Sequence, residues 1–317
     1  MSNVIELPKI RISGKVLSWE VINADGSIDQ SCYRPSDNMI TNVGLDMFAA
    51  GDNNWVSWFT YFCIGTGTAE PSATDTTLTA QTYRAACDYA SYNSLTYSAA
   101  GSDPYYITIQ RGVQTPLGAL NNTYGEIGFS YYSTGNVFCK HRLKNELGEP
   151  TTITVSSAQQ LRLKYALTFN ITPSSTITGT VNIDGIGNIG YTSGWQDTVS
   201  EIINTYYPHI LWLPSGNSNL NYMVLYRTNI SFNPIGTSTY HYDSSAQTTS
   251  CAISTYVAGS YERYKTGYWN VDVGNGTIYG LHVGTTRYPK YVIKFDTPFT
   301  KLNTHALTFQ VRISWGR

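Results

Sequence analysis

Two segments of the chain alternate strictly between apolar and polar positions. The apolar positions are Leu161, Leu163, Tyr165, Leu167, Phe169 and Ile171 in the first segment, and Leu307, Phe309, Val311, Ile313 and Trp315 in the second. A period of two places successive side chains on opposite faces of a strand, one facing a core and the other facing water. Both segments are therefore predicted to be strands of an antiparallel sheet.

The tetrapeptide Ala-Leu-Thr-Phe occurs in both alternating segments, starting at Ala166 and at Ala306. Each half of the chain thus closes with the same kind of strand. Two explanations stay open at this point. The chain is either a tandem of two related β-domains, or a chance match that follows from the few residue types used in such strands.

Short strand-like runs separated by Gly, Asn, Ser and Pro fill most of the remaining sequence. An early example is the run 9–22, which meets the turn Asp25-Gly26 before a second extended run begins near Ile28. Asp-Gly between two such runs predicts a hairpin. Many short strands with few helices predict an all-β fold, mainly antiparallel, built as two β-sandwich or jelly-roll-like modules.

Two short helices are predicted beside these strands. The first covers residues 42–50, where Thr41 or Asn42 can cap the N-terminus. The second covers residues 196–207, where apolar residues recur at helical spacing and a capping-box pattern begins at Ser193.

The domain organisation is predicted from a stretch of weak pattern in the middle of the chain. Residues 173–194 are rich in Ser, Thr and Gly and are expected to form the boundary. An N-terminal β-sandwich module would cover 1–172 and a second β-rich module 173–317. Within the second module, 173–290 is either an insertion or a separate module, and 291–317 supplies the closing strands.

The charge balance excludes several classes of protein. Charged residues make up only 13% of the 317-residue chain, with 20 basic and 21 acidic side chains and a formal net charge of −1. Because no Lys/Arg cluster is present, binding to nucleic acid is not expected.

No run approaches about 18 apolar residues, so no membrane span is expected. The N-terminal sequence lacks the apolar core of a signal peptide.

The cysteine pattern favours a reducing compartment. Five residues are scattered without a C-x-x-C pair: Cys32, Cys63, Cys87, Cys139 and Cys251. An odd number at such spacings suits neither a disulfide framework nor a zinc site. We expect these residues to act as small apolar filler.

Glycine-rich motifs in the sequence do not predict a nucleotide site. Residues 185–190 match G-x-G-x-x-G, but the predicted helix begins several residues later and no alternating βα pattern surrounds the motif. A glycine-rich β-turn is the better interpretation. Residues 64–68 lack the Gly-Lys-Ser/Thr ending of a phosphate-binding loop.

Signatures of catalysis are missing from the sequence. It contains neither H-E-x-x-H nor G-x-S-x-G, and its five His residues show no ligand spacing. A carboxylate pair for glycoside hydrolysis stays open, with Glu126, Asp184 and Asp272 as candidates, because such pairs converge only in space. We expect a protein that is not an enzyme and binds no metal or cofactor.

Tyrosine is the one residue type with a positive functional implication. The chain has 26 Tyr against 10 Phe and 7 Trp. Tyr offers a large amphipathic contact area at low entropic cost and is enriched at interfaces. Candidate interface residues are Tyr105, Tyr131, Tyr132, Tyr206, Tyr207, Tyr240, Tyr242, Tyr261 and Tyr264. They would contact a neighbouring subunit or, alternatively, a sugar.

The order of several motifs along the chain resembles the order found in a family of tailed-bacteriophage virion proteins, most of them tail-associated. They are the helix start I-T-N-V-G-L-D at 40–46, the segment G-T-G-T-x-x-P-x-x-x-D-x-x-L at 65–78, the E-I-G strand at 126–128 and the ending S-W-G-R at 314–317. The resemblance covers roughly residues 39–171 and 291–317. Its motif residues are Gly65, Gly67, Thr68, Pro71, Asp75, Leu78, Glu126, Gly128, Trp315 and Arg317.

The resemblance implies structural rather than catalytic roles for these residues. Gly65 and Gly67 would serve a tight turn, and Asp75 and Thr77 would make local hydrogen bonds in a loop. No catalytic residue carries over from the family.

The expected function is that of a structural component of a tailed-phage virion, in the tail at the collar, baseplate or fibre attachment. Copies of the chain would assemble in the host cytoplasm into a symmetric ring or trimer and contact other tail or connector proteins. Alternatives are a receptor-binding or carbohydrate-binding module that contacts host surface glycan, a capsid decoration protein, and a virion-borne glycan hydrolase.

Overall fold

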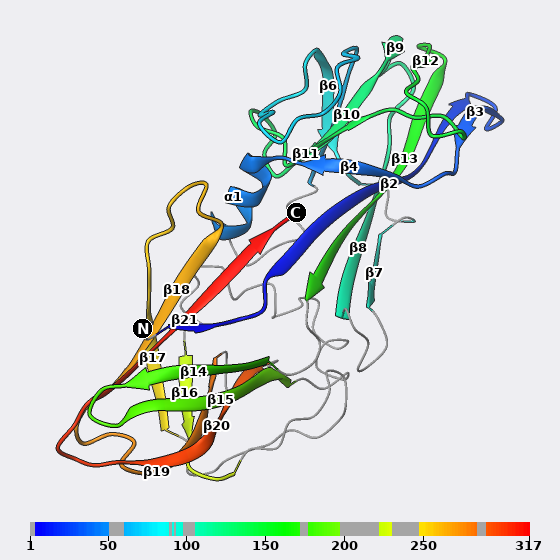
Figure 1. The fold of residues 1–317 in the computed structure, drawn as a ribbon. Coiled ribbons are helices and arrows are strands. Elements are labelled where there is room, and N and C mark those ends of the chain that lie inside the picture. The colour runs from blue at the N-terminus through cyan, green and yellow to red at the C-terminus, as the bar shows by residue number, and fades with distance from the viewer. Residues whose placement is uncertain are drawn as a thin grey trace.

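The computed structural model describes residues 4–50, 60–88, 91, 93–97, 105–171, 177–196, 222–229, 247–283 and 290–317. Over these residues the chain consists of strands and one helix, α1, which confirms the predicted all-β fold (Figure 1). The long alternating segments form β13 and β21, as predicted, and the predicted first helix is α1 (Asn42–Ala50). The strands run in two groups that meet around α1 and β21.

The first group contains the strands of the N-terminal half. They are β2 (Ile10–Asn23), β3 (Ile28–Cys32), β4 (Ser36–Ile40), β5 (Tyr61–Gly65), β6 (Gln81–Ala86), β7 (Ser94–Tyr97), β8 (Tyr105–Gln114), β9 (Asn122–Tyr124), β10 (Glu126–Ser130), β11 (Cys139–Arg142), β12 (Ile153–Val155) and β13 (Gln159–Ile171). One layer has the order β7–β8–β13–β2, and a second has the order β4–β11–β10–β5–β6. The strand β2 pairs with β4 as well, so it links the layers. Phe129 of β10 lies 4.3 Å from Tyr165 of β13, ring centre to ring centre, where the layers face each other.

The second group contains the strands of the C-terminal half and the first strand of the chain. They are β1 (Val4–Glu6), β14 (Ile177–Ile183), β15 (Gly187–Gln196), β16 (Tyr222–Tyr226), β17 (Gln247–Ile253), β18 (Glu262–Trp269), β19 (Gly276–Val283), β20 (Lys290–Lys301) and β21 (Leu307–Gly316). Their order is β14–β15–β20–β19–β16–β17–β18–β21–β1. Phe295 of β20 stacks on Phe309 of β21 at 5.5 Å, so the strands of this group also face each other across apolar side chains.

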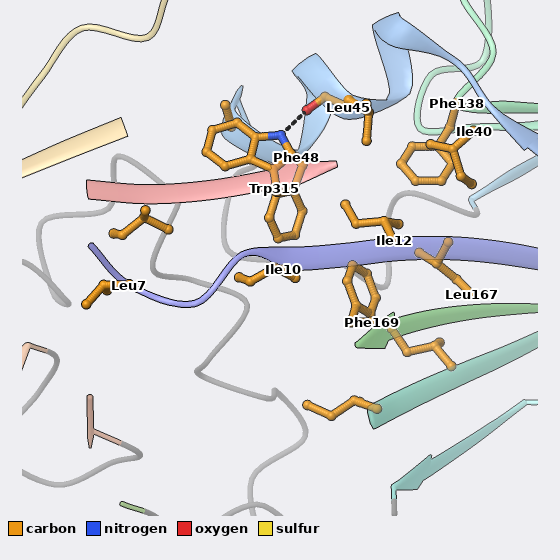
Figure 2. Packing of buried hydrophobic residues seen from close by; sticks show 14 of the residues in the cluster. Leu7, Ile10, Ile12, Ile40, Leu45, Phe48, Phe138, Leu167, Phe169 and Trp315 are labelled. Carbon is orange, nitrogen blue, oxygen red and sulfur yellow. Dashed lines mark hydrogen bonds between the residues drawn. The ribbon is translucent and has the colours of Figure 1, made fainter. Parts of the chain in front are cut away.

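The chain ends join the two groups. Strand β1 pairs in parallel with β21, and β2 begins beside the end of β21, where Ile10 is opposite Trp315. One continuous cluster of buried apolar residues runs through both groups. Figure 2 shows its middle, where Phe48 of α1 lies 5.8 Å from Phe169 and 5.5 Å from Trp315.

The stretch expected to be the boundary, 173–194, contains a hairpin. It is formed by β14 and β15, and β15 pairs further with β20. Gly185 and Gly187 have φ angles of 76° and 104° at its turn, which confirms that the G-x-G-x-x-G match is a β-turn. Ser193 lies inside β15, so the predicted capping box there is wrong. The remainder of the predicted second helix lies outside the described residues.

Candidate functional site

The motifs that carry the family resemblance meet in one region, which we name the motif junction. It comprises residues 39–46, 65–80, 125–142 and 314–317. The backbone N–H of Asn42 donates to the Ala73 carbonyl at 2.7 Å, and that of Thr41 donates to the Phe138 carbonyl at 3.1 Å. Segments far apart in the sequence therefore share one hydrogen-bonded unit.

The start of α1 is held by Thr41. Its buried hydroxyl accepts the N–H of Gly44 at 2.9 Å, so it is the N-cap, and it donates to the Val137 carbonyl at 2.9 Å. Gly44 is required by close packing, because a Cβ there would lie 2.1 Å from the Phe138 carbonyl oxygen. The helix start is thus fitted to the segment before β11.

Asp46, the last residue of the I-T-N-V-G-L-D motif, fastens α1 to the loop between β17 and β18. Its Oδ1 accepts the hydroxyl of Tyr256 at 2.5 Å and the N–H of Gly259 at 2.8 Å. Burial first, and then the hydrogen bond to the Asp46 carboxylate, raise the pKa of Tyr256 well above its ordinary value. The helix therefore binds both strand groups.

The S-W-G-R ending also lies against α1. The indole N–H of Trp315 donates to the Leu45 carbonyl at 2.8 Å (Figure 2). Arg317 donates from Nε to the Ile40 carbonyl at 2.6 Å, and its guanidinium also contacts the Asn42 side chain. The end of the chain thus covers the start of α1.

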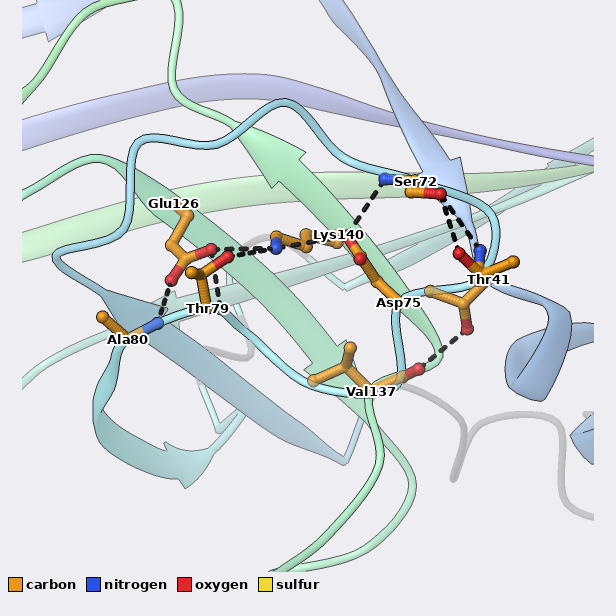
Figure 3. A network of polar contacts seen from close by, with 9 residues as sticks. Thr41, Ser72, Asp75, Thr79, Ala80, Glu126, Val137 and Lys140 are labelled. Atoms are coloured by element: carbon orange, nitrogen blue, oxygen red, sulfur yellow. Dashed lines mark hydrogen bonds and ion pairs between the residues drawn. The ribbon is translucent and has the colours of Figure 1, made fainter.

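A buried ion cluster forms the other part of the motif junction (Figure 3). Lys140 Nζ lies 3.2 Å from Glu126 Oε2 and 3.1 Å from Asp75 Oδ2, and it donates to the Thr79 hydroxyl at 2.7 Å. The exposed fraction is 2% for Lys140, 0% for Glu126 and 26% for Asp75. A buried ammonium is tolerated because these oxygens replace its water.

Glu126 is held as a carboxylate by more than its ion pair. Its oxygens accept the backbone N–H groups of Thr79 at 3.0 Å and Ala80 at 2.7 Å. Burial would raise the pKa of Glu126, but these two N–H donors and Lys140 outweigh it, and the pKa is lowered. The loop 66–80 is thereby attached to β10.

Gly65 and Gly67 make room for this carboxylate. A Cβ on Gly67 would lie 2.3 Å from Glu126 Oε1, and one on Gly65 would lie 2.8 Å from the same atom. Neither glycine is among the described residues with positive φ. They therefore permit a close approach of Glu126, whereas the resemblance implied a tight turn.

Other motif residues shape the loop itself. Asp75 accepts the N–H of Ser72 at 3.0 Å, which confirms the local loop hydrogen bond predicted for it. Leu78 is buried with Cys63 and Val137 beside Gly128, where a Cβ would crowd the Cys139 carbonyl at 2.7 Å. The remaining motif residues, Thr68 and Pro71, lie in the outer part of the loop, exposed and half-buried respectively.

The charged residues of β11 could not be recognised from the sequence. Lys140, His141 and Arg142 are all buried, each with polar partners. His141 contacts the Asp37 carbonyl and the Ser36 hydroxyl, each at 3.1 Å, and burial lowers its pKa to about 4. Three consecutive polar residues resemble a solvated strand edge, so nothing local in the sequence indicated this burial.

The candidate tyrosines do not form one surface among the described residues. Tyr132 is exposed and Tyr131 half-buried, with their rings edge to face at 4.6 Å. Tyr261 has a φ of 52°, and its carbonyl accepts the backbone N–H of Trp315 at 3.0 Å. Tyr264 donates its hydroxyl to Glu262 at 3.1 Å. The side chains of Tyr105, Tyr206, Tyr207, Tyr240 and Tyr242 lie outside the described residues.

Glu126 does not share a site with the other two candidate carboxylates. Glu126 is bound in the motif junction, whereas Asp184 lines a groove of about 120 Å³ between the β14–β15 and β20–β21 turns. Asp272 lies in the turn between β18 and β19. The groove is also lined by Ile186, Phe299, Leu302 and His305, and none of its lining residues within the described ranges is a tyrosine or tryptophan.

Within the described ranges, no group of three or more His, Cys, Asp or Glu side chains is arranged to hold a metal ion. The helix that the structure describes is too short to cross a membrane.

Comparison of the chain with protein-family models, curated proteins and solved structures finds no match.

Proposed function

We propose that this protein is a structural component of a tailed-phage virion, located in the tail at the collar, baseplate or fibre attachment. Two β-sandwich-like modules, joined through the motif junction, would assemble with further copies into a ring or trimer. The proposal combines the sequence resemblance with the geometry of the residues that carry it.

The motif junction is the observation that supports this proposal. Residues that resemble the phage family at four separate places in the sequence contact one another in space. Several of them have packing roles: Thr41 caps a helix, Gly67 makes room for Glu126, and Trp315 is buried in the core. Such a unit suits a protein whose purpose is to hold a shape within an assembly.

The surface is compatible with close contact between copies. Only 13% of the residues are charged, and exposed aromatic rings include Tyr33, Tyr106, Tyr132 and Tyr268. Low charge limits repulsion between identical subunits, and Tyr is favoured at protein interfaces. Salt should therefore have little effect on the assembly.

Light scattering coupled to size exclusion tests the assembly. We expect a single oligomer that persists in about 1 M salt, where charge–charge attraction is screened. A monomer in all conditions, or dissociation by moderate salt, would contradict the proposed mode of assembly.

Mass spectrometry and imaging of purified particles test the location. We expect the chain in purified virions, at a copy number that corresponds to one or a few rings, with density in the tail. A copy number matching the capsid lattice would instead indicate a decoration protein. Binding of the isolated chain to a glycan array would favour the receptor-binding alternative.

A further inference from the structure

The ion cluster of the motif junction brings together a buried amine, the buried carboxylate of Glu126 and the partly exposed carboxylate of Asp75. Lys140 Nζ lies 3.1 Å from Asp75 Oδ2 and 3.2 Å from Glu126 Oε2. Apolar side chains of Leu78, Val137 and Cys63 form a small buried cluster in the same part of the molecule. Structural support for the loop requires only an ion pair, whereas this arrangement also has the parts of an amide-forming site.

We propose that Lys140 and Asp75 form an intramolecular isopeptide bond, with Glu126 as the group that moves protons. This site is independent of the virion proposal. The products are one amide and one water, so no oxidant, reductant or other co-reactant is needed.

Formation of the amide conserves atoms and charge. Lys140 passes one proton of its ammonium group to Glu126, and the free amine attacks Cγ of Asp75. A new N–C bond forms, and one C–O bond of the Asp75 carboxyl group breaks. The proton held by Glu126 and a second proton from Nζ both go to the departing oxygen, which leaves as water. Glu126 returns to its carboxylate form.

The surroundings explain why the carboxyl carbon of Asp75, and not that of Glu126, would react. Both oxygens of Glu126 accept backbone N–H groups, from Thr79 and Ala80, and these bonds fix the carboxylate in its position beside Nζ. Asp75 lies on a loop rather than on a strand, so its carboxyl group can turn toward Nζ. Burial also favours the neutral amide over two separated charges.

The bond would link the loop after β5 covalently to β11. Closing such a long segment of chain restricts the unfolded state and raises stability in the same manner as a disulfide. A protein with five free thiols could in this way carry a covalent brace without relying on an oxidising compartment.

Intact-mass measurement of the folded chain is the direct test. We expect a mass lower than that of the sequence by one water, about 18 Da. A tryptic digest should contain one branched peptide that joins Asp75 to Lys140, with no cleavage after Lys140. The full sequence mass, with separate peptides for the two residues, would overturn the proposal.

Variants and internal controls complete the test. Lys140→Met and Asp75→Ala should restore the full mass, and Glu126→Gln should slow the loss of water after refolding from denaturant. Lys265 is the matched control lysine. It is as buried as Lys140 but has no hydrogen-bond partner among the described residues, so it should keep a free amine. Succinimide formation at Asp25-Gly26 or Asp184-Gly185 also removes water. A mass loss that maps to either pair would overturn the proposal, and this peptide map needs no variant to fold.

Discussion

Trp315 donates its indole N–H to the carbonyl oxygen of Leu45 at 2.8 Å, which joins the last strand to the helix near the start of the chain. The same ring lies 5.5 Å from Phe48 and 5.6 Å from Tyr256, ring centre to ring centre. Because Tyr256 also donates to Asp46, the ring of Trp315 lies at the point where both strand groups meet α1. The contact between the two groups therefore depends strongly on one side chain.

Replacing Trp315 with Ala should destabilise the protein by about 3–5 kcal/mol, because it opens a large cavity and leaves the Leu45 carbonyl without its donor. Urea unfolding of wild type and variant measures this. Tyr268→Ala is the control, since Tyr268 is 54% exposed, and it should change stability by less than about 1 kcal/mol. A Trp315→Ala variant as stable as the control would show that the junction is not held by this ring.

Lys265 is predicted to destabilise the fold. Its ammonium group is buried without a hydrogen-bond partner in the part of the chain that the structure describes, and burial lowers its pKa from 10.5 to about 8. Lys265→Met should therefore raise the free energy of unfolding by roughly 2–3 kcal/mol at pH 7. Lys301→Met is the matched control and should destabilise, because Lys301 is also buried but donates to Asn270, Val271 and Asn275.

The effect of Lys265 should depend on pH in a defined direction. Between pH 8 and pH 10.5 the unfolded chain binds a proton at this residue that the folded chain does not. The stability contributed by a neutral Lys265 therefore rises with pH, and the advantage of Lys265→Met should shrink across this window. A constant difference between variant and wild type from pH 7 to pH 10 would contradict this assignment.

His141 should make the protein sensitive to acid. Burial, the largest cause, lowers its pKa from 6.5 to about 4, so below pH 6.5 the unfolded chain takes up a proton that the folded chain excludes. Stability should fall as the pH decreases from 6.5 to 4, by on the order of 3 kcal/mol from this residue. Thermal unfolding of His141→Gln should show a shallower decrease, whereas a variant of the exposed His305 should follow wild type.

Gly67→Ala should disturb the loop 66–80 through Glu126. The new Cβ would lie 2.3 Å from Glu126 Oε1, so the loop or the carboxylate must move, at a cost of about 1–3 kcal/mol. A double-mutant cycle with Glu126→Ala separates this clash from other effects of the methyl group. Part of the cost of Gly67→Ala should disappear in that background, and the rest comes from Thr79, whose Cβ would lie 2.9 Å from the new methyl group. An unchanged cost would show that the clash with Glu126 does not contribute.

The fold class could be predicted because strands with one buried face repeat their apolar residues at every second position. Strands β13 and β21 are of this kind, and α1 was indicated by Thr41 and the apolar spacing after it. The turn between β14 and β15 was predicted from its glycines, but the two strands escaped prediction because their Ser, Thr and Gly residues do not alternate clearly. It is held by pairing with β20, about 100 residues later in the chain.

The sequence by itself determined the strictly alternating strands, the position of α1 and the set of motif residues, because these depend on local periodicity and capping. Tertiary structure alone decided that the motifs meet, that Gly67 faces a carboxylate, and that Lys140 is buried. The physical reason lies in the range of the interactions. Lys140 can leave water only where Glu126 and Asp75 supply oxygens, and their positions are set by the pairing of β10 with β11 and by the loop above them.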